Sequence, residues 1–233
     1  MFKQFYDEVS STLTYLIADD VTKEAVMIDP VNAYINDYVS VIQQHGLKLK
    51  YALETHVHAD HITAGGELRN QLGAQVAVGE QCGAACADVQ LNDGDVLYFG
   101  QEKVTVIATP GHTAGSLSFR WQDKLFTGDA LLINGCGRTD FQNGNASTLL
   151  DSIVNQLFTF ADETLVYPGH DYQGHRVSSI GQEKLINPRL ANKSRNEFIE
   201  IMANLNLAKP QLIDVAVPAN RFCGMPESCD LQG

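Results

Sequence analysis

The sequence predicts an α/β fold, and three observations support this fold class. The first third of the chain alternates strand-like and helix-like segments, in the order strand, strand, helix, strand. Later apolar runs of strand length end in short turns that carry a histidine or an aspartate. Hydrophobic residues make up 44% of the 233 residues, which is usual for a globular protein with a sizeable core. Because no linker is obvious, we expect a single domain over residues 1–233, with a short extension of helix and loop over about 175–233.

The elements of the first third are predicted from residue preferences. Two segments rich in β-forming residues flank the pair Asp19-Asp20, which favours a turn. Asn32 can cap a helix that Gly46 closes, and Gly73 can end a second helix. The expected elements are strands at 11–18, 25–28 and 51–54, and helices at about 32–44 and 65–72.

The rest of the chain repeats one pattern, in which an apolar run leads into a turn with a possible metal ligand. Three such turns carry His112, Asp129 and His170, and the glycines beside them allow close approach of the backbone. Counting the run before residue 55, four strand ends therefore each deliver a histidine or an aspartate. The expected elements are strands at 104–108, 124–127 and 164–167, and helices at about 146–160 and 194–205, followed by a Pro/Gly-rich tail.

A histidine cluster follows the expected strand at 51–54. Four candidate ligands lie within six positions, and the chain has only seven histidines, so chance is a poor explanation. Imidazole and carboxylate groups bind divalent metals of intermediate softness. In α/β proteins, sites are built at the carboxyl ends of strands. The cluster therefore predicts a metal site, formed by His56, His58, Asp60 and His61 with contributions from His112, Asp129 and His170.

The charge balance argues against some classes of partner. The chain carries 28 acidic and 16 basic residues, and its formal net charge is -12. Such an acidic surface disfavours binding to nucleic acid or to an anionic membrane. No apolar run approaches the length of a membrane span, and residues 1–8 lack the apolar region of a signal peptide. These features predict a cytoplasmic location.

The five cysteines predict reduced thiols, because their number is odd and no secretion signal precedes them. Cys82 and Cys86 are four apart on an expected helix and could face each other, although two small buried side chains are favoured. Cys223 and Cys229 could pair under oxidation. Cys136 lies between two glycines and is interpreted as a closely packed side chain rather than a nucleophile.

The set His-x-His-x-Asp-His at 56–61, with His112, Asp129 and His170, resembles the metallo-β-lactamase superfamily over about residues 10–220. This resemblance implies an αββα four-layer sandwich of metallo-β-lactamase type, with mixed sheets, outer helices and metal at one edge. Within the superfamily, further segments resemble the persulfide dioxygenases of the ethylmalonic-encephalopathy-protein type. These segments are THVHADHITAG at 55–65, PGHTAG at 110–115, FTGDALL at 126–132, GCGRTDFQ at 135–142, HDY at 170–172, NPR at 187–189, NLNL at 204–207 and VPAN at 217–220.

The resemblance implies a sulfur dioxygenase that oxidises glutathione persulfide with O2 and water to sulfite and glutathione. It also implies one Fe(II) per chain, although zinc could occupy similar ligands. Three protein ligands would hold the ion and leave open positions for O2 and for the substrate sulfur. The ligands implied are His56, His112 and Asp129, while His58, Asp60, His61 and His170 are outer-sphere residues in the dioxygenases and could bind a second metal in related hydrolases.

Four residues are candidates for substrate binding. Arg138 could bind a carboxylate of glutathione at two points, or it could pair with Asp140 or another acid. Tyr172 could offer its hydroxyl to the substrate or could simply pack. Asn220 and Arg221 are candidate contacts to the peptide part of the substrate. Exposed apolar residues near the N-terminus could support a homodimer.

Two other functions remain open from the sequence. A binuclear zinc hydrolase of S-acylglutathione thioesters, like glyoxalase II, could use the full set of seven metal-type side chains, with Asp129 bridging two ions. The sequence after Arg138 reads Thr-Asp-Phe-Gln rather than the Phe-Glu-Gly type typical of those hydrolases, and the C-terminal part is short for their helical domain. A metal-dependent binding protein without catalysis is disfavoured because every candidate ligand is present.

Overall fold

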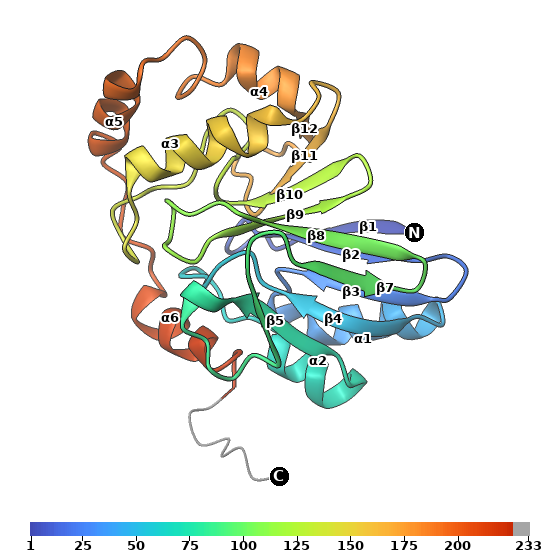
Figure 1. Ribbon diagram of the computed structural model, residues 1–233. Helices are drawn as coiled ribbons and strands as arrows, with labels where there is room; N and C mark the ends of the chain where they lie inside the picture. The colour runs from blue at the N-terminus through green and yellow to red at the C-terminus, as the bar shows by residue number, and fades with distance from the viewer. Residues whose placement is uncertain (226–233) are drawn as a thin grey trace. The chain divides into compact units, whose positions relative to one another are not determined.

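The structure is a computed structural model that describes residues 1–225 (Figure 1). The chain divides into two compact units. Unit 1 contains Met1–Leu91, Tyr98–Lys103 and the chain from Lys209 onward, and unit 2 contains Asn92–Leu97 and Val104–Ala208. This division follows the density of internal contacts, so the expectation of a single domain remains a prediction. No helix within the described residues is long and apolar enough to cross a membrane.

Unit 1 contains a mixed sheet of six strands in the order β1-β2-β3-β4-β5-β6. The first three strands pair antiparallel, and the pairs from β3 to β6 are parallel. The strands are β1 (Phe2–Tyr6), β2 (Leu13–Ala18), β3 (Glu24–Ile28), β4 (Lys48–Leu53), β5 (Gln75–Gly79) and β6 (Val89–Leu91), and the helices are α1 (Ile35–Gln44), α2 (Gly65–Leu72) and α6 (Ile213–Arg221), with short 3-10 turns at Asn32–Tyr34 and Glu80–Cys82.

The core of unit 1 lies between its sheet and the first two helices, which Figure 1 shows along one face of β4 and β5. Tyr38 and Ile42 of α1 and Leu68 of α2 pack against apolar residues of β2, β3 and β4. Spacings of three and four residues place such side chains on one helix face. Helix α2 ends at Gly73 in the left-handed conformation, with φ 71°, which glycine adopts without steric strain.

The second sheet has the order β12-β11-β10-β9-β8-β7 and belongs to unit 2, except for residues 98–103 at the turn between β7 and β8. Helices α3, α4 and α5 cover one of its faces (Figure 1), and their apolar side chains pack on β8, β10 and β11. The elements are β7 (Val96–Phe99), β8 (Glu102–Ala108), β9 (Leu117–Trp121), β10 (Lys124–Gly128), β11 (Leu165–Pro168), β12 (Ser178–Ser179), α3 (Ala146–Asn155), α4 (Ile180–Ile186) and α5 (Arg195–Ala203), with a 3-10 turn at Leu157–Thr159.

In each unit, parallel strands bring candidate ligands to the same sheet edge. β3 pairs parallel with β4 in unit 1, so Asp29 lies beside the start of the histidine cluster. β10 pairs parallel with β11 in unit 2, so Asp129 and His170 follow neighbouring strand ends. The expected strands and helices near these ligands are confirmed, with shifts of a few residues at their ends.

Three expectations about the elements were wrong. The helix expected over 146–160 ends at Asn155 and is followed by a separate 3-10 turn. The Pro/Gly-rich tail contains α6, which includes Pro218 in its interior. Cys82 and Cys86 do not share a helix, because the 3-10 turn ends at Cys82 and Gly83 follows in the left-handed conformation.

The expectation of reduced thiols is also wrong for one pair, because Cys86 and Cys223 form a disulfide. This finding removes one ground for predicting a cytoplasmic location, since disulfides are rare in reducing compartments. Cys82 and Cys136 remain buried thiols, and burial raises the pKa of each thiol to about 11. The pairing considered for Cys229 falls outside the described residues.

Candidate metal centre

The loop after β4 begins with a hydrogen-bonded chain that fixes the ring of His56. Asp29 accepts hydrogen bonds from the Thr55 backbone N–H at 2.7 Å and from Thr55 Oγ1 at 2.8 Å. Because Thr55 Oγ1 donates its only proton to Asp29, it must accept from His56 Nδ1, which lies 2.9 Å away. Nε2 of His56 therefore carries the lone pair that a metal requires.

His58 follows in the same loop and lies in a buried acidic environment within unit 1. Its Nε2 is 3.2 Å from Asp29 Oδ1 and 3.6 Å from Glu54 Oε2. Burial by itself would lower the pKa of His58, but the charges of Asp29, Asp60 and Glu54 raise it. Burial raises the pKa of Glu54, which also accepts a short hydrogen bond from Thr63. These carboxyl groups orient the His58 ring.

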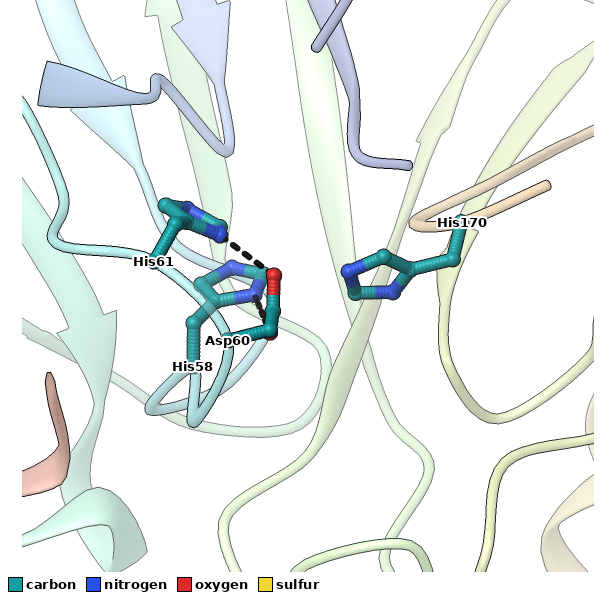
Figure 2. A group of neighbouring side chains, drawn as sticks. All are labelled: His58, Asp60, His61 and His170. Carbon is teal, nitrogen blue, oxygen red and sulfur yellow. Dashed lines mark hydrogen bonds and ion pairs between the residues drawn. The ribbon is translucent and has the colours of Figure 1, made fainter. Parts of the chain in front are cut away.

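The side chains of His58, Asp60 and His61 lie close together in this loop (Figure 2). The rings of His56 and His58 have centroids 4.0 Å apart, and those of His58 and His61 are 4.3 Å apart. His61 Nδ1 lies 2.7 Å from Asp60 Oδ2, an ion-pair contact that Figure 2 marks with a dashed line. Thr12 of the neighbouring chain segment also donates to Asp60 Oδ2 at 3.1 Å. The loop thus presents a compact group of imidazole and carboxylate side chains.

In unit 2, His112 is fixed in the same tautomer by a different partner. Its Nδ1 lies 2.7 Å from the carbonyl oxygen of Arg138, which can only accept, so Nδ1 carries the proton and Nε2 the lone pair. Nε2 is 3.6 Å from Asp129 Oδ2. Two ligand atoms at this separation can share one ion with bonds of roughly 2.0–2.2 Å. A Cβ at Gly137 would lie 2.8 Å from His112 Nδ1, so the backbone at residue 137 can lie this close to the His112 ring only because residue 137 is glycine.

His170 holds the other oxygen of the Asp129 carboxylate. Its Nδ1 lies 2.6 Å from Asp129 Oδ1, and both residues are buried. A carboxylate fixed through one oxygen presents the other in a defined direction. Figure 2 shows His170 on the loop that follows β11. Within unit 2, therefore, His170 orients Asp129, and whether His170 also binds a metal remains a prediction.

The sequence comparisons identify the family. A sequence model described as the Metallo-beta-lactamase superfamily matches residues 7–81 and 87–170. The chain belongs to this superfamily. Its α/β fold, with two mixed sheets flanked by helices, is the metallo-β-lactamase fold, and the predicted family and fold class are confirmed.

Three relatives of this metallo-β-lactamase-fold chain bear on function. The human mitochondrial persulfide dioxygenase ETHE1 is 48% identical over 97% of this chain and 89% of its own length. The crystal structure of ETHE1 from Myxococcus xanthus matches with a TM-score of 0.95 and 56% identity, over 97% of this chain and all of that one. The hydroxyacylglutathione hydrolase GloC of Haemophilus influenzae is 33% identical over 77% of this chain and 92% of its own.

The candidate substrate residues of this superfamily member have varied surroundings. Arg138 pairs with Asp140 through two contacts of 2.7 Å and also donates to the carbonyls of Leu207 and Ala208. Its pairing with Asp140 was one of the two interpretations from sequence. The role of Arg138 in substrate binding remains a prediction.

The other three substrate candidates differ in exposure. Tyr172 is 69% exposed, and its ring stacks on that of His170 with centroids 6.0 Å apart. Arg221 is exposed at the end of α6. Asn220 is buried, and its amide is hydrogen-bonded to the loop between β4 and α2, residues 54–64, which we call the ligand loop of unit 1. Contacts of these residues with a substrate remain predictions.

Sequence reasoning missed the residues that orient the ligands. Asp29, Glu54 and Thr55 are of this kind, and all three are buried. Asp29 adopts the left-handed conformation, with φ 50°, which aspartate tolerates better than most residues. Its position at the end of an apolar run was a usable signal. Its partner could not be inferred, because the parallel pairing of β3 and β4 is not visible in the sequence.

Proposed function

We propose that this chain is a sulfur dioxygenase that oxidises glutathione persulfide with O2 and water to sulfite and glutathione. The observation that carries this proposal is the similarity to the human and Myxococcus xanthus proteins, which extends over 97% of the chain. The residues matched by the family model, 7–81 and 87–170, include every candidate ligand and the residues that orient them. The similarity to the hydrolase GloC is lower and covers less of the chain.

We propose that one Fe(II) per chain is held by His56, His112 and Asp129. Both histidines present Nε2, because Nδ1 of each is engaged by Thr55 or by the Arg138 carbonyl. Two imidazoles and one carboxylate form the ligand set of non-heme iron oxygenases. When bound, Fe(II) supplies the electrons that activate O2 and leaves positions for O2 and sulfur. Zinc would suit the same donors but has no redox chemistry.

The remaining residues have supporting roles in this proposal. His170 orients Asp129, and Asp60 orients His61, without a requirement for a second ion. The persulfide is more acidic than a thiol, so it enters as an anion and needs a local cation in a chain with net charge -12. Arg138, Tyr172 and Arg221 are the proposed contacts for the glutathione part. A homodimer and a cytoplasmic location remain predictions.

The test is anaerobic purification, elemental analysis and oxygen-electrode assay of the same sample. We expect about one iron per chain and O2 consumption that depends on glutathione persulfide. The His112→Ala variant should lose both, because it removes a ligand. Iron-loaded protein that consumes no O2 with this substrate would overturn the proposal.

The second candidate is a binuclear hydrolase of S-acylglutathione thioesters. It is favoured by the presence of all seven metal-type side chains and by the 33% identity to GloC. In that case His58, His61 and His170 would bind a second ion, and Asp129 would bridge the two. Two zinc ions per chain, together with thioester turnover, would select the hydrolase in the same elemental analysis.

A further inference from the structure

We propose that Asn220 is a positioning residue that holds the ligand loop of unit 1 in its metal-binding shape. Asn220 lies near the end of α6, and its side chain is 5% exposed. Its Nδ2 donates to the carbonyls of His58 at 2.9 Å and His61 at 2.8 Å. Its Oδ1 accepts from the Thr63 N–H at 2.9 Å. One side chain therefore holds three backbone groups of the loop.

The chemistry of the amide explains why asparagine suits this position. A primary amide offers two N–H donors and one acceptor oxygen, which match the two carbonyls and one N–H of the loop. A buried backbone N–H or carbonyl that loses its hydrogen-bond partner lowers the stability of the folded state. An aspartate of the same size keeps the acceptor but lacks both donors. The residues joined are 157 to 162 positions apart, so this contact depends on the tertiary fold.

The segment that carries Asn220 is itself attached to unit 1 at several points. Cys223 forms the disulfide with Cys86, and its carbonyl accepts from the Gly66 N–H at 2.8 Å. A Cβ at Gly224 would lie 2.1 Å from the Thr63 carbonyl oxygen, so the segment packs directly on the loop. The segment that carries Asn220 is therefore fixed to the rest of unit 1 by a covalent bond, a hydrogen bond and close packing.

The consequence is a loop whose ligand side chains project from a constrained backbone. His56 and His61 lie on the loop that Asn220 closes, so loss of the three hydrogen bonds frees the backbone that carries them. Ligands that must be ordered on binding hold a metal more weakly than ordered ligands. This inference rests on the proposed function only in taking His56 as a ligand.

Cobalt titration of the apoprotein tests this role without an activity assay. The visible ligand-field bands of Co²⁺ report the geometry of its ligands, and their growth gives the affinity. We expect Asn220→Ala and Asn220→Asp to bind Co²⁺ about 10- to 100-fold more weakly, with shifted bands. The matched control is Asn204→Ala, which removes an exposed amide that donates to the Glu200 carbonyl and should leave both quantities unchanged.

Unchanged Co²⁺ affinity and spectrum in both folded Asn220 variants would overturn the inference. If neither variant folds, hydrogen exchange of the wild-type protein decides. Metal binding and the Asn220 contacts are linked, so Co²⁺ should slow exchange of the amides at Cys223 and Gly224 but not those of α1. Equal exchange with and without Co²⁺ would also overturn it. Wild-type protein that binds Co²⁺ but oxidises no persulfide in its iron form would overturn the proposed function alone.

Discussion

Single hydrogen-bond partners decide which nitrogen of each histidine is available to a metal. In unit 1 the choice for His56 is made by Thr55 and Asp29, and in unit 2 the choice for His112 is made by the Arg138 carbonyl. These partners do not bind the metal themselves. They remove the need to reorganise the rings when an ion arrives, which strengthens binding.

The Thr55→Val variant tests this control of the tautomer. Valine has the shape of threonine but lacks the hydroxyl that accepts from His56 Nδ1 and donates to Asp29. We expect the iron affinity to fall about 10- to 100-fold, measured by equilibrium dialysis with elemental analysis. The control is Thr109→Val, which removes a buried hydroxyl that is hydrogen-bonded to Ser118 and not to Asp29 or His56. Equal iron affinity in the two variants would contradict the assignment.

The candidate ligands could be predicted from sequence because their residue types and local spacing carry the signal. His56, His112 and Asp129 each follow an apolar run directly, so strand and turn are visible together. Asn220 carries no such signal. Its role depends on contacts with residues about 160 positions away, and a single sequence does not show them.

Within unit 1, the turn between β2 and β3 is attached to residues 98–103 through one carboxylate. The backbone N–H of Gln101 donates to Asp19 Oδ2 at 2.9 Å, and Thr22 Oγ1 donates to the same oxygen at 2.7 Å. These hydrogen bonds, that of Gln101 first, lower the pKa of Asp19 from 3.8 to about 2. The ionised form therefore stabilises the folded state.

This pKa shift predicts a pH dependence of stability. Because the folded pKa is the lower one, the contribution is fully present above pH 3.8 and is lost as the pH falls toward about 2. Asp19→Asn should lower the melting temperature of metal-free protein at pH 7, and the difference from wild type should shrink between pH 4 and 2. Asp20→Asn, at an exposed neighbour, should have little effect. A difference that stays constant down to pH 2 would argue against this role.

The elements missed from sequence have weak local patterns. β1 is an edge strand whose residues are all half-buried, so it lacks clear alternation. Helix α6 contains Pro218, which normally argues against a helix interior. Tertiary packing outweighs local preference here, because α6 supplies buried Ala216 and Asn220 to unit 1.

Among the described residues, the disulfide between Cys86 and Cys223 joins positions 137 apart in the sequence. A cross-link that closes so long a loop restricts the unfolded chain strongly. Cys86→Ser should lower the free energy of unfolding by about 2–5 kcal/mol, measured by chemical denaturation without reductant. Reductant should bring wild-type protein to the value of the variant and leave the variant unchanged. Wild-type stability that does not respond to reductant would contradict the pairing.

The order of strand-like and helix-like segments predicted the fold class, but the sequence predicted neither the disulfide nor the division into two compact units. Cysteine spacing does not specify a partner so distant, and the interpretation of reduced thiols rested on the odd count. Within each sheet the strand order follows the chain order, but the two units do not follow the sheets throughout, because residues 98–103 of the second sheet belong to unit 1. Sequence patterns report elements better than they report how elements group.

Gly169 packs so closely against Asp129 and Gly128 that no space is left for a side chain at this position. A Cβ at this position would lie 2.9 Å from Asp129 Oδ1 and 3.1 Å from the Gly128 carbonyl carbon. Even the smallest side chain would therefore press on the oxygen that His170 orients. We therefore expect substitution of residue 169 to disturb the carboxylate of Asp129, although glycine itself has no functional group.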